Sequence, residues 1–204
     1  MYTRKERTNI NMKKTRAVVV SLMMMFLLTA CTGEKSADTN TVSIDKKGTV
    51  TETIVEEFAQ SYYDADELKE MIDQEVADYN AKAGENSVTV KTFEVEEGKV
   101  KLVRTYTSYE DYAALNHSEF FAGTVAEAYD AGYSFEDMVS PDGSTTLTKQ
   151  SVLENGESKI VICDVAGNVR VSGKITYISE DVEVQDHKTA TVLEDGEISY
   201  ILYQ

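Results

Sequence analysis

Apolar and polar residues alternate along most of the chain after residue 40, and short turns interrupt the alternation. Five glycine-containing pairs mark these turns: Lys47-Gly48, Glu97-Gly98, Asn155-Gly156, Gly167-Asn168 and Asp195-Gly196. Asn-Gly and Asp-Gly tolerate the positive φ that tight hairpin turns require, and Val, Ile, Thr or Tyr flank each pair. The pattern predicts four β-hairpins, which join 41–45 with 49–55, 88–95 with 100–106, 146–153 with 158–165, and 189–193 with 197–203.

Three further strands are predicted between the last two hairpins. Residues 169–172 and 174–178 form two of them, separated by a bulge at Gly173, and residues 182–185 form a short third strand. The last strand is apolar on both faces from Tyr200 to Tyr203, which predicts a central or covered position in its sheet.

One region shows the 3.6-residue period of a long amphipathic helix. Its apolar stripe consists of Leu68, Met71, Ile72, Val76 and Tyr79. The stripe predicts a helix over residues 64–83, with Gly84 at its C-terminal cap.

A second helical region is predicted after the second hairpin. It begins at Ser108 and Asp111, which have the spacing of a capping box, and it breaks near Asn116. The pattern predicts that a helix resumes after Ser118, which would act as its N-cap, and runs to Ala131.

The order of these elements predicts an α+β fold, in which antiparallel β-hairpins carry two helical regions packed on the sheet and a β-rich part follows at the C-terminus. Residues 41–204 are assigned to one globular domain. The alternative is a boundary near residues 140–145, because Pro141, the one proline of the chain, lies there in Ser140-Pro141-Asp142-Gly143-Ser144.

The first thirty residues have a different character. Lys13, Lys14 and Arg16 precede an apolar run at residues 17–28, and the sequence Leu28-Thr29-Ala30-Cys31 ends the segment. A helix over the run would rise about 18 Å, which is too short for a hydrocarbon core of about 30 Å. This is the layout of a secretory signal. Translation from Met1 and from Met12 are both compatible with it, and in the second case residues 1–11 lie upstream of the start.

The Leu28-Thr29-Ala30-Cys31 sequence resembles the lipobox of bacterial lipoproteins, and the resemblance covers residues 12–31. It implies that diacylglycerol is attached to the Cys31 thiol, that residues 1–30 are cleaved off as a signal peptide, and that the freed amine is often acylated. Two or three acyl chains hold a protein on a bilayer. The implied location is the extracytoplasmic face of the cell membrane, with residues 31–40 as lipidated cysteine and polar tether, and with no cofactor besides the lipid. The alternatives are an ordinary signal peptide with an incidental cysteine and an apolar N-terminal helix.

The charge balance excludes one class of partner. The chain has 20 Lys and Arg against 36 Asp and Glu, a net charge of −16. Cleavage before Cys31 leaves 14 basic and 35 acidic side chains, a net charge of −21. Phosphate backbones would be repelled, so no nucleic-acid partner is expected.

Few residues have the spacing of a catalytic or metal site. Alternation places Cys163 on the same face as Val161 and Val165, which predicts a buried and inert thiol. His117 and His187 are predicted in loops, and no zinc-ligand spacing occurs. We assign no catalytic residue and no metal ligand.

Eight of the sixteen aromatic residues after residue 30 fall between Tyr106 and Phe135, among many acids. Tyrosine faces can stack on a sugar ring or a cation, and carboxylates can accept its protons. The candidate ligand-binding residues are Tyr109, Tyr112, His117, Tyr129 and Tyr133. The alternative is packing of helices on the sheet, because the tyrosines are spaced by three and four residues. Burial of all four tyrosines would eliminate the binding face.

These features predict a membrane-anchored lipoprotein that acts as a binding or interaction module for a protein, small-molecule or sugar partner. The alternatives are a hydrolase or transferase that acts on envelope polymers, and a structural or assembly subunit of a surface complex. The stretches at residues 173–184 and 198–203 are also similar to exported lipoproteins of Gram-positive bacteria that have no assigned function.

Overall fold

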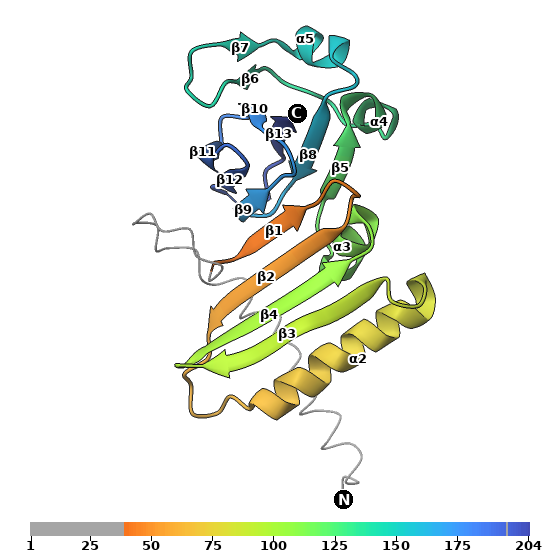
Figure 1. Ribbon diagram of the computed structural model, residues 1–204, viewed down its shortest axis with the longest axis vertical. Helices are drawn as coiled ribbons and strands as arrows, with labels where there is room; N and C mark the ends of the chain where they lie inside the picture. The colour runs from red at the N-terminus through yellow and green to blue at the C-terminus, as the bar shows by residue number, and fades with distance from the viewer. Residues whose placement is uncertain (1–38, 195) are drawn as a thin grey trace, which may run out of the picture. The chain divides into compact units, whose positions relative to one another are not determined.

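The strands are divided between two sheets, and helices cover part of their faces (Figure 1). The computed structural model describes residues 39–194 and 196–204, all of which belong to one compact unit. Four helices and thirteen strands are present in these residues, which confirms the α+β class and the β-rich C-terminal part. The predicted signal peptide, Cys31 and the predicted tether up to residue 38 lie outside the described residues.

Sheet A has seven strands in the order β11-β12-β9-β1-β2-β4-β3. The strands are β1 (Thr41–Ile44), β2 (Val50–Glu57), β3 (Val88–Glu96), β4 (Lys99–Tyr106), β9 (Gly167–Arg170), β11 (Val182–Asp186) and β12 (Thr189–Val192). The hairpins β1–β2 and β3–β4 are confirmed, and Gly48 and Gly98 in their turns have φ of 85° and 76°. β1 and β9 pair in parallel, and the other pairs of this sheet are antiparallel.

Sheet B has six antiparallel strands in the order β5-β8-β13-β10-β6-β7. The strands are β5 (Phe120–Thr124), β6 (Met138–Val139), β7 (Thr146–Leu147), β8 (Lys159–Cys163), β10 (Ile175–Ile178) and β13 (Ser199–Tyr203). All five residues of β13 are buried, and β13 lies between β8 and β10. This confirms the central position that its apolar faces predict. Residues 140–145 form the turn between β6 and β7, where Ser140 N donates to Thr145 O at 2.9 Å.

The long helix forms where the apolar stripe predicts it, as α2 (Ala65–Ala83). Asp64 caps its N-terminus by accepting hydrogen bonds from the backbone N–H groups of Asp66 and Glu67 at 2.9 and 3.1 Å. Gly84 ends it at a φ of 135°. Ile72 and Val76 are its buried residues, and the helix packs along β3 (Figure 1).

The second helical region is partly as predicted. α3 (Tyr109–Asn116) begins after Ser108, whose hydroxyl accepts from Asp111 N, and ends at His117 in the left-handed conformation. The helix predicted from Ser118 to Ala131 is wrong over its first half, because residues 120–124 form β5. α4 (Val125–Asp130) starts only at the Thr124–Glu127 capping box. Burial of Phe120 and Phe121 on opposite faces of β5 explains the strand, because only an extended backbone sends consecutive side chains to opposite faces.

The predicted hairpin between 146–153 and 158–165 is wrong. Residues 149–154 form α5 (Lys149–Glu154), and β8 pairs with β5 and β13 instead. The Thr148 hydroxyl caps this helix by accepting from Ser151 N at 3.3 Å, and Val152 is fully buried. A capped turn with a single buried residue is sufficient for a short helix, and alternation alone does not reveal it.

The predicted hairpin between 189–193 and 197–203 is also wrong, because β12 lies in sheet A and β13 in sheet B. Gly173 is not a bulge within one sheet, since the chain passes there from β9 in sheet A to β10 in sheet B. A Cβ on Gly173 would lie 2.2 Å from Gln204 O, so close approach of the backbone explains the glycine.

Two groups of buried side chains hold these layers together. One lies between the inner face of sheet A and one face of sheet B, and it includes Val50, Val169, Cys163 and Ile201. The other lies between the opposite face of sheet B and α4 and α5, and it includes Phe121, Val152 and Ile162. Sheet B is therefore covered on both faces, whereas the described apolar core covers only the inner face of sheet A.

Candidate binding surfaces

The five residues predicted to bind a ligand do not form one site. Tyr112 is 2 % exposed and packs its ring between those of Tyr106 and Phe120, at centroid distances of 5.2 and 4.7 Å. It is a core residue. His117 is exposed at the C-terminal cap of α3, where the φ of 54° marks the end of the helix.

Tyr109 and Tyr133 do lie near each other, since both pack against Phe121. Their ring centroids are 5.0 and 5.4 Å from that of Phe121, and both tyrosines are half-buried. The Tyr133 hydroxyl donates a hydrogen bond to Glu119. Burial and this carboxylate raise the pKa of Tyr133, and burial and Glu110 raise the pKa of Tyr109. The two phenols therefore remain neutral donors at physiological pH.

Tyr129 lies in a different place, on α4, with 60 % of its surface exposed. It lines an open hollow of about 360 Å³ together with Val125, Ala126, Asp130 and Leu153. The five candidates are thus divided among the core, a helix end, a half-buried aromatic group and this hollow. Because the tyrosines are not all buried, the prediction of an aromatic binding surface is not eliminated.

A buried polar network lies on the inner face of sheet A, and the sequence analysis missed it. Arg104 on β4 is 3 % exposed, and Glu52 on the neighbouring β2 is 8 % exposed. Glu52 Oε2 accepts from Arg104 Nε at 3.0 Å, from Arg104 Nη2 at 2.8 Å and from the Tyr106 hydroxyl at 2.6 Å. Burial lowers the pKa of Arg104, but Glu52, Tyr106 and Glu75 together outweigh burial, so that the pKa is raised.

Two helices complete this network. Arg104 Nη1 donates to Glu75 of α2 at 3.2 Å, and Arg104 Nη2 donates to Asn116 of α3 at 2.9 Å. Asn116 Nδ2 in turn donates to the Tyr106 hydroxyl at 3.2 Å. Every charged nitrogen of the guanidinium has a partner, so the network joins α2 and α3 to the sheet rather than offering an open site. The sequence alone does indicate that Arg104 lies on the same strand face as Val100, Leu102 and Tyr106, because every second residue of a strand shares a face.

The outer face of sheet A carries a second feature that the sequence analysis missed. The strand registers align residues of all seven strands in two rows; the two residues of a strand are two apart on β12, β9, β1, β2 and β4, and three apart across an irregularity on β11 and β3. The first row consists of Glu183, Thr191, Asn168, Thr41, Thr53, Val103 and Thr92. The second row consists of Asp186, Thr189, Arg170, Ser43, Thr51, Thr105 and Thr89. We call these two rows the hydroxyl face.

Hydroxyl groups dominate this face, and charges are confined to one side of it. Eight threonines and one serine occupy the fourteen positions, and the positions on β1, β2, β4 and β3 are all uncharged. Thr41 Oγ1 donates to Thr39 O at 3.0 Å and Thr191 Oγ1 to Asn168 Oδ1 at 2.8 Å. Thr189 Oγ1 is shielded from solvent and has no hydrogen-bond partner among the described residues.

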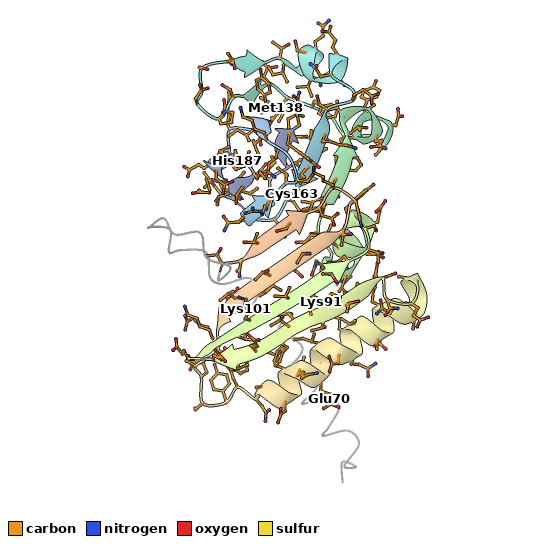
Figure 2. All side chains as sticks on the ribbon, in the orientation of Figure 1. Glu70, Lys91, Lys101, Met138, Cys163 and His187 are labelled. Atoms are coloured by element: carbon orange, nitrogen blue, oxygen red, sulfur yellow. The ribbon has the colours of Figure 1, made fainter. Side chains whose placement is uncertain are left out.

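Among the described residues, the threonines and the serine of the hydroxyl face are all partly exposed. α2, α3 and sheet B pack on the opposite face, where Val50, Val88, Tyr106 and Val169 are buried. Two cations, Lys91 on β3 and Lys101 on β4, lie on the strands at the uncharged side (Figure 2). The signal was present in the sequence as the period-two pairs Thr41 and Ser43, Thr51 and Thr53, and Thr189 and Thr191.

Cys163 occupies the position that alternation predicts. It is fully buried in the core between the sheets (Figure 2), and burial raises the pKa of its thiol to about 12. In residues 39–194 and 196–204, no three His, Cys, Asp or Glu side chains are placed to hold a metal ion. Within the same residues, no helix has the length and hydropathy that are needed to cross a bilayer. Comparison of the chain with protein-family models, curated proteins and solved structures finds no match.

Proposed function

We propose that this chain is a lipoprotein held on the extracytoplasmic face of the cell membrane through Cys31, and that it binds its partner through the hydroxyl face. The observation that supports the binding role is the partly exposed double row of hydroxyl side chains on a sheet whose other face is buried among the described residues. The anchor rests on the sequence Leu28-Thr29-Ala30-Cys31 and the basic and apolar segments before it.

The distance between anchor and folded unit suits a surface module. The described structure begins at Thr39, where Thr39 Oγ1 accepts from Asn168 Nδ2 at 3.2 Å. Residues 32–38 separate this point from Cys31, and seven extended residues span at most about 25 Å. The next residue, Asn40, is fixed to β2, because its side chain accepts from Val55 N at 2.7 Å. A tether of this length would let the folded unit lie up to about 25 Å from the anchored cysteine.

The alternatives have less support. An envelope-polymer hydrolase or transferase requires a cleft in which titratable groups converge. The hollow beside Tyr129 offers one carboxylate, that of Asp130. An assembly subunit would present a contiguous apolar patch, and within the described chain Tyr129 and Leu153 are the exposed large apolar residues that share this hollow.

The anchor is tested by expressing the whole chain in a bacterium that processes lipoproteins. We expect the wild-type protein in the membrane fraction, resistant to high-salt washing, with a diacylglyceryl group on the N-terminal peptide that begins at Cys31. Cys31→Ser should abolish the modification and release any exported protein from the membrane. Cys163→Ser is the matched control and should leave both unchanged. An unmodified Cys31 in the wild-type product, or complete release by salt, would contradict the proposed anchor.

A further inference from the structure

We propose that the hydroxyl face binds an uncharged polysaccharide that lies across the strands along the two rows. The inference deepens the proposed function and depends on it for the location of the binding surface. It does not depend on the lipid anchor.

The net negative charge of the chain and the uncharged positions of the rows favour an uncharged ligand. The chain carries a net charge of −16, so an anionic polymer or a second copy of the same chain would approach against long-range repulsion. A strongly cationic partner would favour the acidic surfaces over the side of the hydroxyl face on β1, β2, β4 and β3, where no position of the two rows is charged and the neighbouring charges include Lys91 and Lys101. That side comprises Thr41, Ser43, Thr51, Thr53, Thr89, Thr92, Val103 and Thr105. A neutral ligand meets no such long-range repulsion.

The chemistry of the rows fits a sugar. A threonine presents a hydroxyl, which both donates and accepts a hydrogen bond, and a methyl group beside it. A pyranose presents the same combination, with hydroxyls at its rim and C–H groups on its faces. Val103 in the first row adds a purely apolar position between Thr53 and Thr92.

The geometry fits a chain of sugars better than a single sugar. Neighbouring strands lie about 4.8 Å apart, so the six strands from β12 to β3 give rows about 24 Å long. Two residues along a strand separate the rows by about 7 Å. The side chains repeat from strand to strand along each row, so a polymer with a repeating unit can make similar contacts at successive strands.

Twist of the sheet favours a flexible polymer over a rigid surface. Adjacent strands rotate by about 20 to 25°, so the rows turn steadily from β12 to β3. A crystalline polysaccharide or another preformed protein surface can touch only a few strands of such a face. A single glycan strand can follow the turn, because its glycosidic bonds rotate.

Chain length should therefore control affinity. A hydroxyl that leaves water for another hydroxyl gains little free energy, so each sugar contributes weakly. Successive sugars on one strand bind at high effective concentration, and the contributions accumulate. We expect measurable binding to oligosaccharides only above a minimum length, with affinity rising for each added sugar until the rows are filled.

The test uses the soluble chain from residue 32 to residue 204, which contains the whole compact unit. The probes are amorphous cellulose and chitin in pull-down assays, and their soluble oligomers from dimer to hexamer in calorimetry. Polygalacturonate serves as the anionic comparison. We expect retention by at least one neutral polymer, a length-dependent affinity for its oligomers and no retention by polygalacturonate.

The diagnostic variant is Thr53→Val combined with Thr105→Val, which removes one hydroxyl from each row and keeps the shape and strand propensity of the side chains. Its affinity for the longest oligomer should fall about tenfold. Thr146→Val is the control, because Thr146 is an exposed strand residue in sheet B and should bind as the parent does. Unchanged far-ultraviolet circular dichroism verifies that each variant is folded.

Three results would overturn the proposal. The first is no retention of the parent by either neutral polymer, and the second is equal affinity of the parent and the double variant. The third is a concentration-dependent dimer, seen by light scattering, that the double variant loses, because the occupant of the face would then be a second copy. None of these results bears on the modification of Cys31, so failure of this inference and failure of the proposed anchor are distinguishable.

Discussion

Replacement of Arg104 by methionine would test whether the buried polar network holds sheet A to its helices. Methionine has similar length and fills the space of the aliphatic stem, so the change removes charge and hydrogen bonds with little loss of volume. Glu52 Oε2 would lose two charged donors and keep only the Tyr106 hydroxyl, at 2.6 Å. Asn116 Oδ1 would lose its donor, and Glu75 would lose its tie to the sheet.

The magnitude follows from the burial of the two partners. Arg104 is 3 % exposed and Glu52 is 8 % exposed, so solvent cannot replace the missing charge. Removal of one partner of a buried ion pair costs about 3–5 kcal/mol, mainly because the other charge is left without compensation. Glu75 adds little, since its side chain is 53 % exposed. We expect the free energy of unfolding to fall by about 3–4 kcal/mol. Glu52→Gln combined with Arg104→Met removes both charges and should recover part of this loss.

Urea unfolding of the chain from residue 32 to residue 204, followed by circular dichroism, measures the change. The midpoint should move to lower urea at an unchanged slope. Arg170→Met is the matched control, because Arg170 is exposed on β9, and its unfolding free energy should change by no more than about 0.5 kcal/mol. A loss below about 1 kcal/mol for Arg104→Met, equal to that of the control, would refute the reasoning.

Three further predictions concern other parts of the structure. Gly173→Ala would place a methyl group 2.2 Å from Gln204 O and should cost about 1–3 kcal/mol in urea unfolding, whereas Gly156→Ala, whose nearest contact is 3.4 Å, should cost less. Burial raises the pKa of Cys163 to about 12, so a thiol reagent at pH 8 should label it only in urea; rapid labelling of the folded protein would contradict this. Hydrogen bonds from the hydroxyl of Ser140 and from Ser144 lower the pKa of Asp142 from its ordinary value of 3.8 to about 2. The Asp142 carboxylate therefore stabilises the β6–β7 turn fully above pH 3.8, and this stabilisation is lost as the pH falls through about 2. A nuclear magnetic resonance titration with a midpoint near 3.8, unchanged in Ser140→Ala, would disprove that assignment.

Some elements could be predicted from the sequence because interactions between neighbouring residues determine them. The turns at Gly48 and Gly98 connect neighbouring strands, so a positive φ and flanking β-branched residues were sufficient to predict the β1–β2 and β3–β4 hairpins. α2 carries its own stripe and its own caps at Asp64 and Gly84. In each case the interactions that decide the element lie within a few residues.

The candidate site was less predictable, for a physical reason. Composition drew attention to the aromatic segment, but a ring buried in the core, such as Tyr112, and a ring exposed on a helix, such as Tyr129, have the same sequence signal. Glu52 and Arg104 are 52 residues apart, and nothing local indicates that they meet. The prediction of a lipid anchor at Cys31 stands on the sequence alone and awaits its test.

By itself, the sequence determined which side chains share a face on the regular strands, because alternation is a property of the extended backbone; the irregularities in β3 and β11 break that alternation. It placed Thr51 with Thr53, and Thr189 with Thr191, on faces opposite to Val50 and Ala190. Only the tertiary structure decided that these faces are one surface, that β12 and β13 belong to different sheets, and that residues 120–124 are extended. Strand pairing is decided by contacts between distant segments and by the total surface area that these contacts bury. No single stretch of the sequence determines either quantity.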